Sequence, residues 1–173
     1  EYTSSSNPRL VSHRLFRMSA DGSLDPSWPD SGLALGRRTF GGKPLLVGDG
    51  AGGVFAAWLD HVEARLDFFL EPYPGYVVHG LSELRLTRVS GSGEPAPGWS
   101  TDGLLVRGVA PESLYAEFVR APIAASDGAG GVLLAWADSS GGDDLMRAWR
   151  IGANGAAAGG CARDGVVLST SPV

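Results

Sequence analysis

The residues that most often catalyse reactions or bind metals are few in this chain of 173 residues, and they match no known site pattern. The three histidines, His13, His61 and His79, share no spacing typical of a metal site. Cys161 is the single cysteine, so neither an intrachain disulfide nor a cysteine-based metal cluster is expected. The sequence also lacks the HExxH, phosphate-loop and GxSxG patterns. We therefore expect no catalytic residue, no metal site and no cofactor, and favour a protein that is not an enzyme.

Acidic residues leave one catalytic alternative open, because glycoside hydrolysis uses two carboxyl groups at a defined separation. Asp60, Glu63, Asp67 and Glu71 lie close together in the sequence. Their spacing selects no pair, since the separation of two carboxyl groups depends on the fold. Cleavage or binding of a glycan is therefore the alternative function.

Aromatic residues gather in the segment 61–83, HVEARLDFFLEPYPGYVVHGLSE. Loops that carry aromatic side chains often bind ligands, and the candidates here are Phe69, Tyr73, Tyr76 and His79. The favoured alternative is an extra β-hairpin whose aromatic side chains cover a neighbouring part of the protein. The segment 109–121 is predicted to form a short packing helix.

The chain repeats itself, and this pattern determines where the residues above must lie. Residues 44–60 read PLLVGDGAGGVFAAWLD, and residues 122–138 read PIAASDGAGGVLLAWAD, with no gap between the two. A second pattern runs from an arginine to a group of apolar residues and occurs three times, in 17–35, 88–106 and 150–168. It contains a tryptophan in the first two copies and Cys161 in the third. Two interleaved sets of matches indicate internal repeats.

Short apolar runs separated by glycine-rich turns predict an all-β fold. Asp49, Gly50, Gly52 and Gly53 suit a tight turn between two strands, so residues 44–60 are predicted to form a hairpin. A full unit then has four antiparallel strands, at about 44–48, 53–59, 84–90 and 103–107. A second full unit has strands at about 122–126, 131–137, 145–151 and 165–169, and a half unit at about 13–19 and 32–36 precedes both. The predicted parts are 1–36, 37–108 with an insertion at 61–83, and 109–173.

Four-stranded units with a tryptophan and a turn aspartate at fixed places resemble the blades of β-propellers. The pattern DGxGGxxxAWxD resembles repeats of large secreted bacterial propellers. More distantly, Ser19-Ala20-Asp21-Gly22 ahead of Trp28 resembles the Asp-box of sialidases. The resemblance implies about two and a half blades, the alternative being an open β-sandwich. The repeats and the lack of a catalytic pattern favour an extracellular scaffold or protein-interaction segment, whose partners are the remaining blades, other subunits or a glycan. We expect the chain to be part of a longer one.

Repeated residues are expected to have structural roles. Trp58 and Trp136 share one position and Trp28 and Trp99 another, which favours packing between units over exposed platforms for sugars. The arginines that begin the longer pattern are Arg17, Arg88 and Arg150.

Arginine and aspartate suggest two kinds of contact. We expect Asp60 to pair with Arg88 and Asp138 with Arg150 across adjacent strands, the alternative being a clamp of three arginines for a carboxylate. Asp49 and Asp127 are expected to accept backbone N–H bonds in their turns rather than to bind calcium, which needs several oxygen ligands.

The charge of the chain excludes some partners. The net charge is −5 and basic residues form no stripe, so nucleic acid and anionic membranes are not expected partners. No apolar run approaches the ~20 residues of a membrane-spanning helix, and the first residues do not form a signal peptide.

Overall fold

The computed structural model describes residues 11–39, 43–69, 75–108, 122–138, 145–160 and 165–170. These residues form β-strands joined by turns and contain no helix. The strands are β1 (Val11–Leu15), β2 (Leu33–Thr39), β3 (Leu45–Gly48), β4 (Val54–Phe69), β5 (Gly75–Val89), β6 (Leu104–Arg107), β7 (Ile123–Ser126), β8 (Val132–Asp138), β9 (Leu145–Ile151) and β10 (Val166–Thr170).

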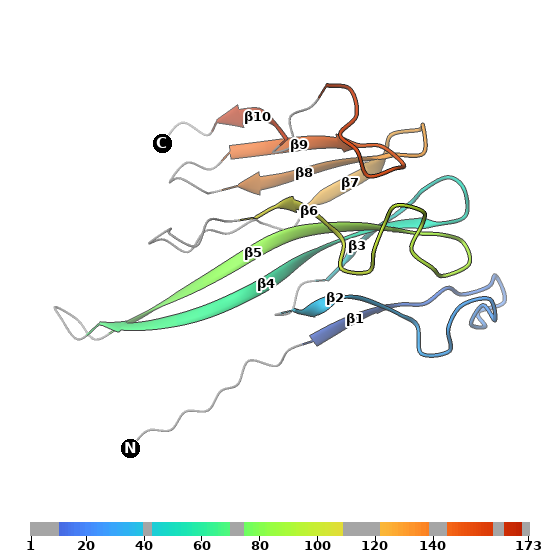
Figure 1. Cartoon of the computed structure of the whole chain (residues 1–173), viewed down its shortest axis with the longest axis horizontal. Helices are drawn as coiled ribbons and strands as arrows, with labels where there is room; N and C mark the ends of the chain where they lie inside the picture. Colours follow the sequence, from blue (N-terminus) through green and yellow to red (C-terminus); the bar gives the residue numbers. More distant parts are fainter. Residues whose placement is uncertain are drawn as a thin grey trace, which may run out of the picture.

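The strands form three antiparallel sheets, one for each part of the repeat. The first unit is the pair β1–β2, the second unit is the sheet β3-β4-β5-β6, and the third unit is the sheet β7-β8-β9-β10. The sheets lie one above another in chain order (Figure 1). In each complete unit the chain order is also the order of hydrogen-bonded strands, as expected from short connections.

The predicted strands agree with the structure to within one residue at each end except in the first unit, where β2 also continues to Thr39, and in β4 and β5. β1 ends at Leu15 rather than continuing to residue 19, and an isolated bridge joins Met18 to Leu24 instead. β4 and β5 continue beyond the repeat, so their pairing extends from Val54 opposite Val89 to Phe69 opposite Gly75. The segment 61–83 is therefore not a loop. The described parts of its backbone, in β4 and β5, are a paired extension of the second unit, and Figure 1 shows them projecting from the side opposite the glycine-rich turns.

Side chains on both faces of the second unit are buried, because a sheet lies against each face. On one face, Phe55, Leu84 and Leu86 pack with Leu134 and Trp136 of the third unit. On the opposite face, Ala56, Trp58 and Val89 pack with Leu15, Trp28 and Leu35 of the first unit. Successive side chains of a strand point to opposite faces, which is why neighbouring residues of β4 belong to different cores.

Trp58 lies against the glycine that precedes β6, and Trp136 lies against the glycine that precedes β10. Trp58 is buried, and a Cβ atom built on Gly103 would lie 2.6 Å from Cη2 of its ring. Gly165 has the same relation to Trp136, at 2.8 Å. Both glycines have positive φ, +74° and +76°, a conformation that disfavours other residues. The glycine of each repeat is therefore required by the ring as well as by the turn.

We predict that Gly103→Ala destabilises the protein by about 3–5 kcal/mol, because the new methyl group must displace the buried Trp58 ring as well as accept a positive φ. Gly50→Ala is the matched control, since Gly50 has φ +76° and no heavy atom lies within 4 Å of the point that its Cβ would occupy. Its expected cost is about 1–2 kcal/mol. Urea unfolding of both variants measures the difference, and equal losses would show that the ring does not constrain Gly103.

Candidate functional site

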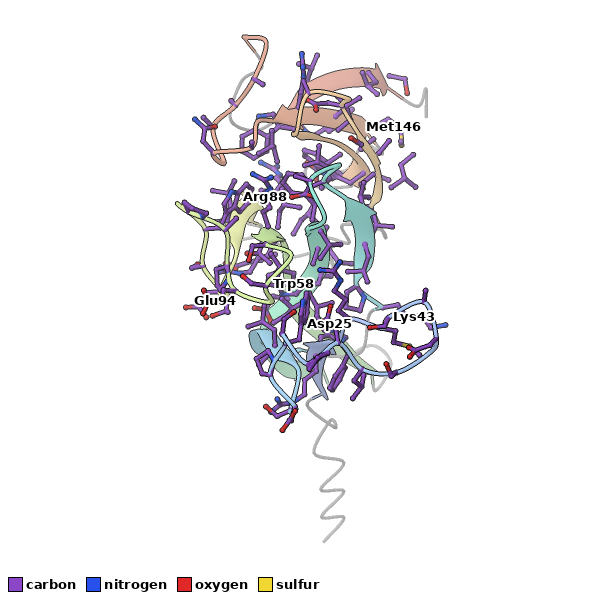
Figure 2. All side chains as sticks on the ribbon, turned by 90° about the vertical axis from the view of Figure 1, so that its right-hand side faces the viewer. Asp25, Lys43, Trp58, Arg88, Glu94 and Met146 are labelled. Atoms are coloured by element: carbon purple, nitrogen blue, oxygen red, sulfur yellow. The ribbon has the colours of Figure 1, made fainter. Side chains whose placement is uncertain are left out.

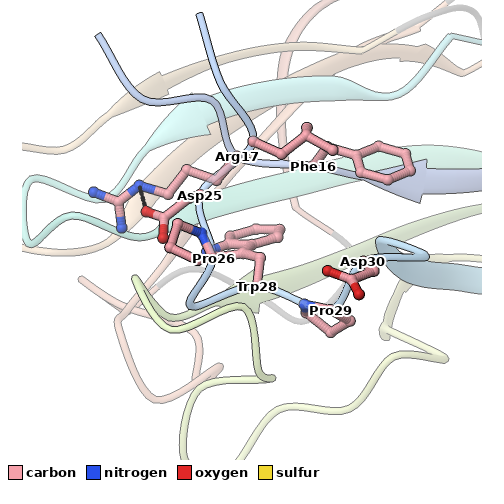
Figure 3. Close-up of a pocket in the computed structure, with 8 residues that line it drawn as sticks. Phe16, Arg17, Asp25, Pro26, Trp28, Pro29 and Asp30 are labelled. Carbon is pink, nitrogen blue, oxygen red and sulfur yellow. Dashed lines mark ion pairs between the residues drawn. The ribbon is translucent and has the colours of Figure 1, made fainter. Parts of the chain in front are cut away.

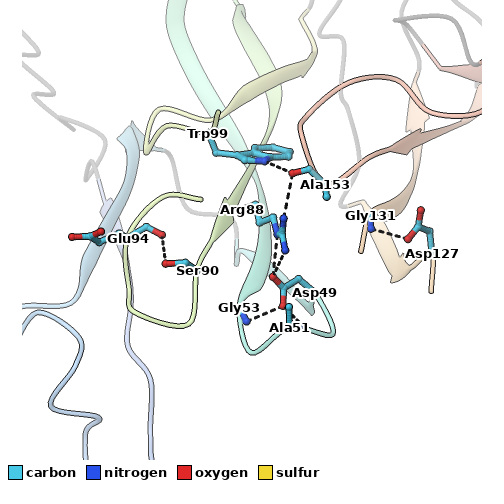
Figure 4. A network of polar contacts seen from close by, with 10 residues as sticks. All are labelled: Asp49, Ala51, Gly53, Arg88, Ser90, Glu94, Trp99, Asp127, Gly131 and Ala153. Carbon is cyan, nitrogen blue, oxygen red and sulfur yellow. Dashed lines mark hydrogen bonds and ion pairs between the residues drawn. The ribbon is translucent and has the colours of Figure 1, made fainter. Parts of the chain in front are cut away.

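The turn aspartates hold the glycine-rich hairpins closed and bind an arginine of the same unit. Asp49 Oδ1 accepts the backbone N–H groups of Ala51 and Gly53, both at 2.8 Å. Its Oδ2 accepts Arg88 Nε at 3.0 Å and Nη2 at 2.8 Å (Figure 4). Asp127 repeats this arrangement in the third unit. It accepts Ala129 and Gly131 N–H at 2.8 and 2.7 Å and Arg150 Nε at 2.9 Å.

These hydrogen bonds stabilise the charged form of both aspartates. Burial acts to raise the pKa of Asp49, but the N–H of Ala51, Arg88 and the N–H of Gly53 together hold that pKa below its usual value. The pKa of Asp127 is lowered mainly by the N–H of Ala129 and then by that of Gly131. The carboxylate of each turn is therefore already bound by backbone N–H groups and an arginine of its own unit.

The arginine pairs differ from those expected across the strands. Asp60 lies 3.6 Å from Arg85, and Asp138 lies 2.9 Å from Arg147, so the predicted pairs with Arg88 and Arg150 are wrong. The register explains the shift. Arg88 lies opposite Phe55, near the turn that carries Asp49, whereas Asp60 lies opposite Glu83 at the other end of the unit.

Arg17, Arg88 and Arg150 each have a carboxylate partner in their own unit. Arg17 Nε lies 3.4 Å from Asp25, and the other two bind the turn aspartates. These contacts link each arginine to a different sheet. They differ from a clamp in which all three would meet one external carboxylate.

Tryptophan and arginine join one unit to the next at a single carbonyl. Between the first and second units, Trp28 Nε1 and Arg17 Nη1 donate to the carbonyl oxygen of Gly91, at 2.9 and 2.7 Å. Between the second and third units, Trp99 Nε1 and Arg88 Nη1 donate to the carbonyl oxygen of Ala153, at 2.8 and 3.4 Å. We call each of these contacts a junction. Gly91 and Ala153 occupy the same position of the repeat, three residues after the arginine.

A glycine lies beside the tryptophan ring at each junction, and at the first junction a side chain in its place would clash with the ring. A Cβ atom on Gly93 would lie 2.8 Å from the Trp28 ring, and one on Gly155 would lie 3.5 Å from the Trp99 ring. Both glycines have φ near +80°. Gly22 is the corresponding glycine of the first unit, and nothing lies within 4 Å of the equivalent point. The first unit therefore exposes the turn that, in the second and third units, accepts hydrogen bonds from the tryptophan and arginine of the preceding unit.

The side chains around the second junction add aromatic and charged contacts. The Phe55 and Trp99 rings meet edge to face, with centroids 5.8 Å apart, and the Arg88 guanidinium lies 5.6 Å from the Phe55 centroid. Figure 2 shows Arg88 nearer the third sheet than Trp58 is. The junction thus combines a hydrogen bond, an ion pair and an aromatic contact at one point.

The structure does not place the side chains that were candidates for ligand binding. Phe69, Tyr76 and His79 lie on β4 and β5, but their side chains, like all of Tyr73, lie outside the described residues. Cys161 and the predicted helix at 109–121 also lie outside them. Glycan binding at this hairpin stays a prediction.

Two hollows lie in and beside the first unit. One, of about 150 Å³, is lined by residues of the first unit that include Phe16, Arg17, Asp25, Trp28 and Asp30 (Figure 3). The other, of about 240 Å³, lies between β1 and the hairpin β3–β4. Within the described ranges, no group of three or more histidine, cysteine or acidic residues could hold a metal ion.

Sequence reasoning missed the ion pairs between units. Asp138 is buried, and Arg107 Nε of the second unit lies 3.0 Å from its Oδ2, on the side opposite to the predicted partner Arg150. The corresponding residue of the first unit is Gly36, which lies against Trp58 instead. Because the same repeat position holds Arg107 in the second unit and Gly36 in the first, the sequence could have indicated that the contacts between units differ here.

No protein-family model, curated protein or solved structure matches this chain. Among the described residues, no helix is long and apolar enough to cross a membrane.

We predict that acid weakens the contribution of Asp49. Because its folded-state pKa is below the unfolded value, its stabilisation is full above about pH 4 and is lost as the pH falls through the folded-state pKa. Asp49→Asn should therefore cost about 2 kcal/mol near pH 7, and progressively less as the pH falls below about 4. Asp102→Asn, in an exposed turn, removes the same charge and controls for the net charge. A loss for Asp49→Asn that stays constant with pH, measured by urea unfolding, would contradict this role.

We predict that Arg88 and Trp99 act together, since both donate to the carbonyl of Ala153. In a double-mutant cycle, Arg88→Met and Trp99→Phe should show a coupling free energy of about 1 kcal/mol. Arg88→Met combined with Trp28→Phe is the control pair, because Trp28 donates to Gly91 at the other junction. These two substitutions should be additive to within about 0.5 kcal/mol. Equal coupling in the two cycles would contradict a local junction.

Proposed function

We propose that this chain is a segment of an extracellular β-propeller that acts without catalysis, as a scaffold or protein-interaction module. The observation that carries the proposal is the junction, which recurs between successive units with the same residue types at the same positions. Contacts that recur in this way relate neighbouring sheets by a similar rotation, and such a series continues around a ring or along a helix.

The polar groups of the described units support a structural role rather than a catalytic one. Asp49 and Asp127 bind arginines and the backbone of their own turns. Asp138 binds arginines from two units. Each of these carboxylates already stabilises the fold, so using it in a reaction would break the contacts that hold the sheets.

The outer face of the third unit supports an interaction role. We use this name for the face of β7–β10 that is turned away from the second unit. Leu133 lies on it and is 45% exposed, whereas Phe55, at the same position of the second unit, is 1% exposed because the third unit covers it. The other large apolar residues of this face are also exposed, and they correspond to residues of the second unit that pack against the third: Ile123, Met146, Val166 and Leu168.

Large apolar side chains exposed together on one face of a sheet often mark a binding site in proteins. It fits the face of another four-stranded unit, because the second unit uses the same positions to bind the third. Arg150 adds a polar group to this face. Its side chain is 41% exposed and corresponds to Arg88, which reaches across a junction.

We predict that the chain associates through this face as its concentration rises, and that Leu133→Glu together with Leu168→Glu abolishes association by burying charge in the contact. Val167→Glu is the control, since Val167 lies opposite Arg147 and is exposed, like Leu105 at the same position of the second unit. Sedimentation velocity over a wide concentration range measures the mass. A chain that stays monomeric throughout, or whose association survives the double substitution, would contradict the proposed surface.

A further inference from the structure

Among the described residues, the first unit contains only the last two strands of a complete unit. In the second unit β4 pairs with β5, and in the third β8 pairs with β9. The corresponding strand of the first unit is β1, which pairs with β2 on one edge and, among the described residues, with no strand on the other. An unpaired edge leaves backbone N–H and C=O groups available to an added strand.

A hollow occupies the place where the missing strands would lie. It measures about 240 Å³ and is lined by Leu15, Phe16 and Met18 on one side and by Leu46 and Val54 of the second unit on the other. Leu46 is 51% exposed although it lies on the face of the second unit turned toward the first. These apolar side chains surround the edge of β1 and would contact a strand added there.

Phe16 fills part of the place that belongs to a tryptophan in complete units. Gly32 corresponds to Gly103 and Gly165, whose neighbours are the rings of Trp58 and Trp136. A Cβ atom on Gly32 would lie 2.7 Å from Cζ of Phe16. The Phe16 side chain is 49% exposed, whereas Thr87, at its position in the second unit, is fully buried.

Arg17 also has a different kind of carboxylate partner from the corresponding arginines of the complete units. In the complete units the corresponding arginines bind the turn aspartate of the first hairpin, Asp49 or Asp127. Arg17 instead lies 3.4 Å from Asp25, which is replaced by alanine in the other repeats (Figure 3). Its side chain is 44% exposed, close to the 41% of Arg150 and above the 19% of Arg88. A cation is thus available for a further carboxylate.

We propose that the free edge of β1 binds a β-hairpin with the sequence pattern of residues 44–60 and 122–138. Its second strand pairs antiparallel with β1, its tryptophan takes the place of the Phe16 ring over Gly32, and its turn aspartate binds Arg17. The proposal deepens the proposed function, on which it rests, by naming the class of partner. The hairpins of a second copy of this chain are already paired within their own sheets, so the partner is a further segment with this pattern.

The experiment adds such a hairpin to the full chain. A copy of residues 122–138 is placed ahead of residue 1, so that residues 1–10 connect it to β1. We expect amide hydrogen exchange in Val11–Leu15 to slow by about tenfold or more, and the melting temperature to rise. The control extension carries Asp→Ala and Trp→Ala at the positions that copy Asp127 and Trp136. Exchange in β1 that is equal in the extended chain and its control would overturn the proposal.

Phe16→Thr provides a second measurement, since threonine is the residue at this position of the second unit. It should lower the melting temperature of the original chain, where Phe16 covers Gly32, and have no such effect in the extended chain. An equal loss in both would show that no tryptophan replaces the ring, and would overturn the proposal. Slow exchange at β1 in the original chain, accompanied by the mass of a dimer, would overturn it in favour of hairpins exchanged between copies.

The two proposals can fail separately. Association through Leu133 and Leu168 with no effect of the added hairpin would leave the proposed function in place and remove only this inference.

Discussion

A single backbone carbonyl between successive sheets is the contact on which this structure depends. At Gly91 and again at Ala153, that oxygen accepts a tryptophan N–H and an arginine guanidinium from the preceding unit. A flat apolar face can bind its neighbour at many angles, because the hydrophobic effect has no direction. Directed hydrogen bonds at one end of the sheet set the relative position of the units, while Leu, Phe and Trp side chains supply most of the favourable free energy.

The arginine of each junction links contacts within a unit to contacts between units. Arg88 binds Asp49 of its own turn with two nitrogens and reaches Ala153 of the third unit with the remaining one. The planar guanidinium suits this double role, because its five donors have fixed directions. The carboxylate of Asp49 in turn closes the glycine-rich hairpin, so the local turn and the packing of two sheets depend on one charged pair.

The differences between repeats are as informative as the identities. Arg107 of the second unit approaches Asp138 of the third, whereas Gly36 of the first unit lies against Trp58 of the second. Phe16 lies against Gly32, whereas a tryptophan lies against the corresponding glycine of each complete unit, and Asp25 pairs with Arg17 where the complete units use a turn aspartate. These changes are found where the neighbour differs, which indicates that each unit is adapted to what lies beside it.

The sequence alone determined the all-β architecture, the sheets of two, four and four strands, and the hairpins closed by Asp49 and Asp127. These features depend on local patterns, namely alternating apolar residues and glycines that tolerate positive φ. Pairing partners depended on tertiary structure. The same sequence predicted Asp60 with Arg88, because it showed which strands are adjacent and not the register that brings Arg85 to Asp60 and Arg88 to Asp49. The junctions and the exposed face with Leu133 were likewise decided by the packing of one sheet on another, since the exposure of a side chain depends on its neighbours in space.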